Sequence, residues 1–225
     1  HHRYLHSFPT RRSSDLVSGN IFVASTGTIS ASSSANRFVA SGAGRTFTLN
    51  GTARVNANET QTGAATLPFS YQYNNFASYT FAPTSWVSFR SPTTTTVTQG
   101  IDGIAGSPFS NVEIAAITNL TAAGSNTHTF KSNVDIAGIL AFPRITAATN
   151  TSLIINFGSF TIKVGGNIQL NGSNANGHAG GRTYNSGTSS IELNGTTAQN
   201  TLGGTDLPST FYNLKLNNSV SVTDR

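Results

Sequence analysis

Cysteine is missing from this chain and charged residues are scarce, and each shortage excludes a class of protein. None of the 225 residues is Cys, and Asp, Glu, Lys and Arg together make up 9% of the chain, against about 25% in typical soluble domains. Without Cys, a disulfide scaffold and a cysteine-ligated zinc site are excluded. Thr, Ser, Asn and Gly are abundant instead, and they disfavour helix and favour short strands joined by tight turns.

Long apolar runs and clusters of basic residues are also absent from the sequence. No apolar stretch approaches the roughly 20 residues of a membrane-spanning helix, so we expect no membrane span. The formal net charge is +5, but the basic residues after residue 16 stand singly from Arg37 to Arg225. Binding to nucleic acid needs concentrated positive charge, so the sequence predicts no nucleic-acid partner.

The first sixteen residues differ in composition from everything that follows. The stretch HSFPTRRSSDL, at residues 6–16, resembles the conceptual translation of a common short-read sequencing adapter. On this resemblance residues 1–16 are an adapter-derived artefact, which we expect to be disordered or unpacked, and the natural N-terminus is expected to be missing. Setting these residues aside leaves 10 basic and 7 acidic residues, a net charge of +3.

Short alternating segments recur between turns rich in Gly, Asn and Ser. Three of them are GNIFVAS at residues 19–25, RTFTLNG at 45–51 and SFTIKVGG at 159–166. Residues that favour strands at every second position are the signature of a half-buried strand. No sustained apolar pattern with the 3.6-residue period of a helix occurs. The sequence therefore predicts an all-β protein.

The order of these segments repeats once along the chain. At an offset of 113 residues Ile21 falls on Val134, and at a smaller offset residues 87–89 fall on residues 191–193. A conserved order of matched segments predicts two divergent copies of a unit just over 100 residues long. The copies are expected at residues 17–129 and 130–225, the second one truncated.

Two architectures suit such a repeat. In a parallel β-helix, or β-solenoid, short parallel strands of successive coils stack, and Asn side chains at the turns can form hydrogen-bonded ladders. In tandem antiparallel β-sandwiches, each copy would form a separate unit of about 100 residues. Short segments, turns rich in Gly and Asn, and loops of variable length favour the solenoid, with the sandwiches as the alternative.

Three motifs of the second copy resemble repeat regions in large secreted and cell-surface proteins of Bacteroidetes-type bacteria. They are TIKVGGN at residues 161–167, IELNGTTAQ at 191–199 and FYNLKLNNS at 211–219. The resemblance implies a β-solenoid stalk in an exported protein, with flanking repeats of the same chain as its partners, and it supplies no activity. The implied location is secreted or at the cell surface, with the export signal outside this fragment.

A solenoid enzyme acting on polysaccharides would need clustered carboxylates, for calcium or for paired acid and base catalysis. Glu113 and Asp135 are the best pair that the sequence offers, because they are about one coil apart. Each stands at a solvent-facing position of an alternating strand. His128 and His178 are far apart, and we expect both to be turn residues. The sequence therefore predicts no catalytic residue, no metal site and no cofactor.

The aromatic-rich run at residues 69–86 is the stretch that best suits a ligand. Aromatic faces stack on sugar rings, so Tyr71, Tyr73, Tyr79 and Trp86 are possible carbohydrate contacts. The alternative is that these rings fill or cap the core of the solenoid.

These observations together predict a non-catalytic stalk or spacer segment of a large, exported, adhesin-like surface protein. One alternative is a polysaccharide-binding module that uses the aromatic run, with a cell-surface or environmental polysaccharide as its partner. Another alternative is part of a polysaccharide-degrading solenoid enzyme.

Overall fold

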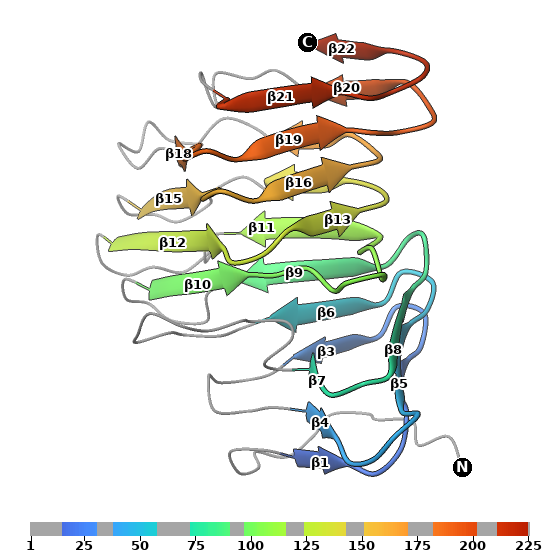
Figure 1. The fold of residues 1–225 in the computed structure, drawn as a ribbon. Helices are drawn as coiled ribbons and strands as arrows, with labels where there is room; N and C mark the ends of the chain where they lie inside the picture. The colour runs from blue at the N-terminus through green and yellow to red at the C-terminus, as the bar shows by residue number, and fades with distance from the viewer. Residues whose placement is uncertain are drawn as a thin grey trace.

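The computed structural model consists of strands, turns and irregular segments, and the part of the chain that it describes contains no helix (Figure 1). The described residues are 15–30, 38–57, 73–90, 97–115, 124–142, 151–170, 182–201 and 211–224. The all-β prediction is confirmed.

The chain winds as a solenoid whose coils contribute strands to three faces (Figure 1). The first face holds two sheets: β1 (Asp15–Val17), β4 (Phe38–Ala40) and β7 (Tyr73–Asn74), then β10 (Val97–Ile101), β12 (Gly124–Phe130), β15 (Thr151–Asn156) and β18 (Arg182–Asn185). The second face holds β2 (Ile21–Val23), β5 (Thr46–Leu49) and β8 (Ser78–Phe81), then β13 (Val134–Ile136), β16 (Thr161–Val164), β19 (Ser190–Leu193) and β21 (Asn213–Leu216).

The third face is a single 8-stranded sheet, called the long sheet below. In chain order its strands are β3 (Thr28–Ser30), β6 (Arg54–Ala57), β9 (Trp86–Arg90), β11 (Asn111–Ala115), β14 (Leu140–Phe142), β17 (Ile168–Leu170), β20 (Gln199–Thr201) and β22 (Val222–Asp224). Pairing on all three faces is parallel throughout the described residues. The antiparallel sandwiches are therefore excluded, and the β-solenoid prediction is confirmed.

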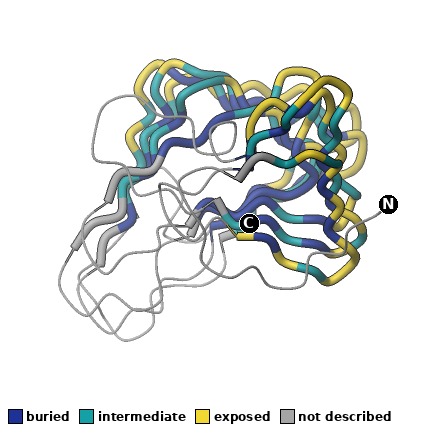
Figure 2. The backbone as a smooth tube through the Cα atoms, turned by 90° about the horizontal axis from the view of Figure 1, so that it is seen from below, coloured by how far each residue is buried: buried dark blue, intermediate teal, exposed yellow. Residues whose placement is uncertain are grey.

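Side chains alternate between the core and the outside, because successive residues of a strand point to opposite faces. In β2 the flanking Ile21 and Val23 are buried and Phe22 between them is exposed, and β16 repeats the pattern with buried Ile162 and Val164. Exposed residues gather at the outer turns, as Figure 2 shows. Each large apolar side chain that is fully buried in this way contributes about 1.5–3 kcal/mol to folding.

The corner between the second face and the long sheet depends on glycine. In the motif TIKVGGN, a Cβ added to Gly165 would lie 2.4 Å from Ala137 O, and one added to Gly166 would lie 2.6 Å from the carbonyl carbon of Gly138. Gly166 N also donates to Gly138 O at 2.8 Å. Glycine therefore lets the backbones of consecutive coils approach each other at this corner.

Gln199, the last residue of the motif IELNGTTAQ, ties the same corner together. Its side chain is buried, and its Oε1 accepts a hydrogen bond from Gly195 N at 2.8 Å. Its Nε2 donates to Val164 O at 2.7 Å and to Gly166 O at 2.5 Å, both on the preceding coil. One amide side chain therefore bonds to three backbone groups of this corner, although Val164 O also accepts from Asn194 N at 3.1 Å.

Asparagine side chains link successive coils at the corner between the first and second faces. Asn20 Oδ1 accepts from Thr46 N at 3.0 Å, and Asn133 Oδ1 accepts from Thr161 N at 2.8 Å. In each pair the amide belongs to the coil next to the one with the asparagine. A ladder of side chains, as the sequence analysis expects, occurs on the first face, where Asn185 Nδ2 donates to Asn156 Oδ1 at 2.6 Å and Asn156 Nδ2 donates to Thr129 Oγ1 at 3.2 Å.

The stack is interrupted on two of its faces at the fourth coil, which contributes β10 and β11. On the first face β7 and β10 belong to separate sheets, and on the second face β8 and β13 do. The fourth coil is linked to the fifth by the bridge of Phe109 with Ile136. It is linked to the third by bonds from Ser110 Oγ to Phe81 O at 2.8 Å and from Asn111 Nδ2 to Pro83 O at 3.0 Å. The long sheet continues, because β9 and β11 pair from end to end. It is the ladder that joins the two halves of the molecule.

The predicted repeat agrees with the coils in its first part. Ile21 and Val134 both begin strands of the second face, β2 and β13. The later match joins different faces, because residues 87–89 lie in the long sheet and residues 191–193 lie in the second face. Strands of all three faces alternate between buried and exposed residues in the same way, so two segments with matching sequence patterns can belong to different faces. The division into copies at residue 129 stays a prediction.

The described part begins inside the segment that resembles a translated adapter. Asp15 and Leu16 belong to β1, where they pair with Phe38 and Val39 of β4. Pairing of this kind uses backbone groups that every such residue carries, so it does not depend on the origin of the segment, which stays a prediction. Residues 1–14 lie outside the described residues.

Replacing Gln199 by Leu should destabilise the solenoid by about 2 kcal/mol or more, because buried backbone groups lose their partners. Urea unfolding followed by circular dichroism measures the free energy of unfolding. The matched control is Gln169→Leu in β17, where the side chain is half-exposed, and its effect should stay within about 0.5 kcal/mol. Equal effects of the two substitutions would contradict the role of Gln199.

Candidate functional site

Tyr73, predicted as a carbohydrate contact, lies in the core instead of on an exposed face. Its side chain has 0% exposure. Its ring stacks on Phe38, with centroids 5.4 Å apart and planes 6° from parallel, and meets the edge of Phe47 at 5.2 Å. The ring therefore cannot stack on a sugar, and the prediction for this residue is wrong.

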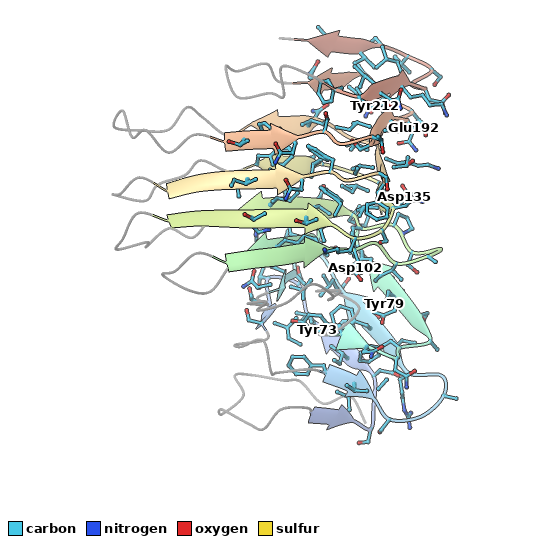
Figure 3. The ribbon with its side chains drawn as sticks, turned by 60° about the vertical axis from the view of Figure 1, so that its left-hand side comes forward. Tyr73, Tyr79, Asp102, Asp135, Glu192 and Tyr212 are labelled. Atoms are coloured by element: carbon cyan, nitrogen blue, oxygen red, sulfur yellow. The ribbon has the colours of Figure 1, made fainter. Side chains whose placement is uncertain are left out.

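Tyr79 is half-buried and packs with the same cluster (Figure 3). Its ring lies 6.0 Å from that of Phe47 and 5.9 Å from that of Phe76, and its hydroxyl donates to Tyr73 O at 2.7 Å. Burial is the main cause that raises the pKa of its phenol above the ordinary 10.0. Tyr71 lies outside the described residues. These contacts favour the alternative in which the aromatic run fills the core.

Trp86 differs from these tyrosines because it lies on the outer side of the long sheet. In β9, Val87 and Phe89 are buried in the core, so Trp86 and Ser88 point the other way. The register places Arg54 of β6 beside Trp86, and Glu113 of β11 beside Ser88. We call Arg54, Trp86, Ser88 and Glu113 the outer cluster.

The outer cluster is held together by charge, hydrogen bonding and an aromatic ring. The Nη1 atom of Arg54 forms an ion pair with Oε2 of Glu113. Ser88 Oγ donates to the same oxygen at 2.8 Å. The guanidinium carbon of Arg54 lies 5.5 Å from the centroid of the Trp86 ring, within the range of a cation–π interaction. The side chain of Glu113 is 12% exposed, and that of Arg54 is 31% exposed.

This cluster spans the interruption between the third and fourth coils. Arg54 belongs to the second coil, Trp86 and Ser88 to the third, and Glu113 to the fourth. Residues 59 positions apart in sequence are thus joined across two rungs of the long sheet. The Glu113 carboxylate is largely buried and the Arg54 side chain is partly exposed, and removing one partner of such a pair destabilises the fold. The outer cluster therefore clamps the junction of the two halves.

The structure does not bring Glu113 and Asp135 together. Glu113 lies on the long sheet, whereas Asp135 of β13 is exposed on the second face (Figure 3). Asp135 is in register with Lys163 of the next coil. The two carboxyl groups that the sequence offers as the best acid and base pair thus belong to different faces.

Charges of alternating sign form a ladder on the outer side of the second face. Asp135, Lys163, Glu192 and Lys215 are in register on successive coils. Glu192 Oε1 accepts from Asn217 Nδ2 at 3.0 Å and lies 3.3 Å from Lys215 Nζ. The bond from Asn217 is the main cause that lowers the pKa of Glu192 below its ordinary 4.5, and Lys215 adds to it. The ladder is suited to holding coils together.

His128 is not the turn residue that the sequence analysis expects. It lies in β12, it is fully buried, and the register places it between Gln99 and Ile155. Its side chain points into the core, where the residue in register on the next coil is the apolar Ile155. His178 lies outside the described residues.

Within the ranges that the structure describes, no three His, Cys, Asp or Glu side chains gather where they could hold a metal ion. In the same ranges there is no helix of the length and hydrophobicity that a membrane span requires. Comparison with protein-family models, with curated proteins and with solved structures finds no match to this chain. The likeness of the three motifs to bacterial surface repeats therefore stays a prediction, and the function is argued from the chain's own geometry.

Replacing Glu113 by Gln should lower the free energy of unfolding by about 2 kcal/mol, because the Arg54 guanidinium loses its charged partner. Asp135→Asn is the matched control on the second face, where an exposed carboxyl should contribute about 0.5 kcal/mol or less. Both effects are measured by urea unfolding at neutral pH. A control effect as large as that of Glu113→Gln would argue against a clamp.

Lowering the pH through the range in which Glu192 takes up a proton should lower the free energy of unfolding. Its folded pKa is lowered, so its contribution is present above the unfolded value near 4.5 and is lost as pH falls through the folded value. Unfolding midpoints in urea, measured from neutral pH downward, should drop less steeply for Glu192→Gln than for the natural sequence. Identical pH dependence in the two proteins would refute the assignment.

Proposed function

We propose that this chain is a non-catalytic spacer, a stalk segment of an exported, adhesin-like surface protein. The observation that carries the proposal is the long sheet, which runs without interruption from β3 to β22. Each coil adds one strand to this ladder, and β1 and β22 lie at opposite ends of the stack (Figure 1). A segment of this form holds whatever flanks it apart along its axis.

The chemistry of the motifs also supports a spacer. Gly165, Gly166 and Gln199 belong to the stretches that resemble bacterial surface repeats. The two glycines approach the backbone of the preceding coil, and Gln199 Nε2 donates to two carbonyl oxygens of that coil. These contacts hold successive coils together, which is what a rigid spacer needs. The same resemblance supports a secreted or cell-surface location and flanking repeats as partners.

The placement of the aromatic residues favours a spacer over a module that binds through residues 69–86. Tyr73 and Phe76 are buried, and Tyr79 is bonded to the backbone of Tyr73. The separation of Glu113 and Asp135 on different faces likewise gives no support to paired-carboxylate hydrolysis. The spacer is therefore the function that the geometry supports best.

A spacer should hold its two ends at a fixed separation. The chain has no native cysteine, so spin labels on Ser18→Cys and Ser219→Cys, both exposed and at opposite ends, report one distance by pulsed electron resonance. We expect a single narrow distribution, because the long sheet couples the ends.

The matched control is the pair Thr183→Cys and Ser219→Cys, which lies on one side of the junction. Its width gives the contribution of the labels themselves. A distribution across the junction much broader than that of the control would contradict a rigid spacer. Release of new reducing ends from a polysaccharide by the intact chain would contradict a non-catalytic role.

A further inference from the structure

We propose that Asn50 is a site of spontaneous chemical modification, where the side-chain amide is converted to aspartate and isoaspartate with loss of ammonia. This inference goes beyond the spacer role and does not depend on it. The described part of the chain holds the pair Asn-Gly at residues 50–51 and at residues 194–195. Such a pair is prone to this reaction, because glycine has no side chain to shield its backbone nitrogen. The pairs at residues 171–172 and 176–177 lie outside the described residues.

The reaction joins the two residues of the pair and needs no partner except water. The backbone nitrogen of Gly51 loses its proton to a base in the solvent and forms a bond to Cγ of Asn50. The side-chain nitrogen takes up a proton and leaves as ammonia, so that a cyclic imide remains. Water then adds to one carbonyl carbon of this ring. Opening on one side gives aspartate, and opening on the other side gives isoaspartate, in which the main chain runs through the side-chain carbon.

The two described Asn-Gly pairs occupy the same place in their coils. Asn50 directly follows β5 and Asn194 directly follows β19, so both stand at the end of a strand of the second face. Asn50 N donates to Val23 O at 3.0 Å, and Asn194 N donates to Val164 O at 3.1 Å, in each case on the preceding coil. Thr follows the glycine in both pairs. Local sequence and position in the fold are therefore matched.

The backbone nitrogen that must react is bonded in one pair and not in the other. Gly195 is buried, and its N donates to Gln199 Oε1 at 2.8 Å. In the part of the chain that the structure describes, Gly51 N donates no hydrogen bond, and Asn50 beside it is exposed. A buried N–H that is already bonded reacts only after that bond opens. Asn50 is therefore the reactive residue of the two, and Gln199 protects Asn194.

Modification at Asn50 would alter the turn that joins β5 to β6. Asn50 O accepts from Ala53 N at 2.9 Å, and Asn50 N bonds to Val23 O of the preceding coil. Isoaspartate lengthens the main chain by one carbon atom between these two bonded groups, so the two bonds cannot both keep their geometry. The change therefore weakens the contact between the first and second coils.

Peptide mass spectrometry of the intact chain, incubated at mildly alkaline pH and body temperature, tests the proposal. Trypsin cuts after Lys and Arg, so a brief digestion recovers Asn50 in residues 46–54 and Asn194 in residues 183–215, where fragmentation assigns the modified position. We expect aspartate and isoaspartate to accumulate at residue 50 over days, about fivefold or more faster than at residue 194. No conversion at residue 50, or equal rates at the two residues, would overturn the proposal.

Variants separate protection by Gln199 from protection by the folded state in general. Gln199→Leu removes the acceptor of Gly195 N. The rate at Asn194 should then rise by about fivefold or more, while the rate at Asn50 stays the same. Glu113→Gln is the matched control, because it should destabilise the chain by a similar amount from a different face. Equal acceleration at Asn194 in the two variants would mean that the reaction follows unfolding, and would refute the role of Gln199.

Discussion

The parallel ladder of the long sheet is the constraint on which the rest of this structure depends. It passes through every coil from β3 to β22. The ladder of the first face stops between β7 and β10, and that of the second face stops at β8 and restarts at β13, with a single bridge at Phe109 in the coil between them. Parallel strands need a crossover between partners, so each rung fixes the path of a whole coil. This register determines which buried side chains stack on one another, where glycines of neighbouring coils approach, and which outer charges lie side by side.

The interruption of two faces gives the outer cluster its importance. In coils that are paired on all three faces, backbone hydrogen bonds of three sheets hold neighbouring coils together, so a single side-chain contact adds little. Between β9 and β11 the long sheet is the continuous one, and the Arg54 and Glu113 pair lies across that stretch.

The sequence predicts the strands and their inward residues well, because alternation with a period of two is a local signal. Ile21 and Val23, or Ile162 and Val164, point inward as their pattern indicates. The outward position of Trp86 follows from the same rule, since Val87 and Phe89 are the inward pair of that strand.

Other features leave no local signal. Alternation does not tell which face a strand joins, so residues 87–89 and 191–193 match in pattern and differ in place. Tyr73 stands in a strand of two residues, too short for any period to reveal its direction. The pairing of Arg54 with Glu113 depends on loop lengths over two coils, which set the register. Contacts between coils are therefore what the sequence alone does not specify.

The central claim is that, in the described residues, the long sheet is the one ladder of strands that crosses the junction without a break, and native-state hydrogen exchange tests it most directly. Amides of β9 and β11 that point toward each other should exchange only on global unfolding, whereas amides of β10 that point toward β7 should exchange through smaller openings. Equal protection of the two groups, or faster exchange between β9 and β11, would contradict the account.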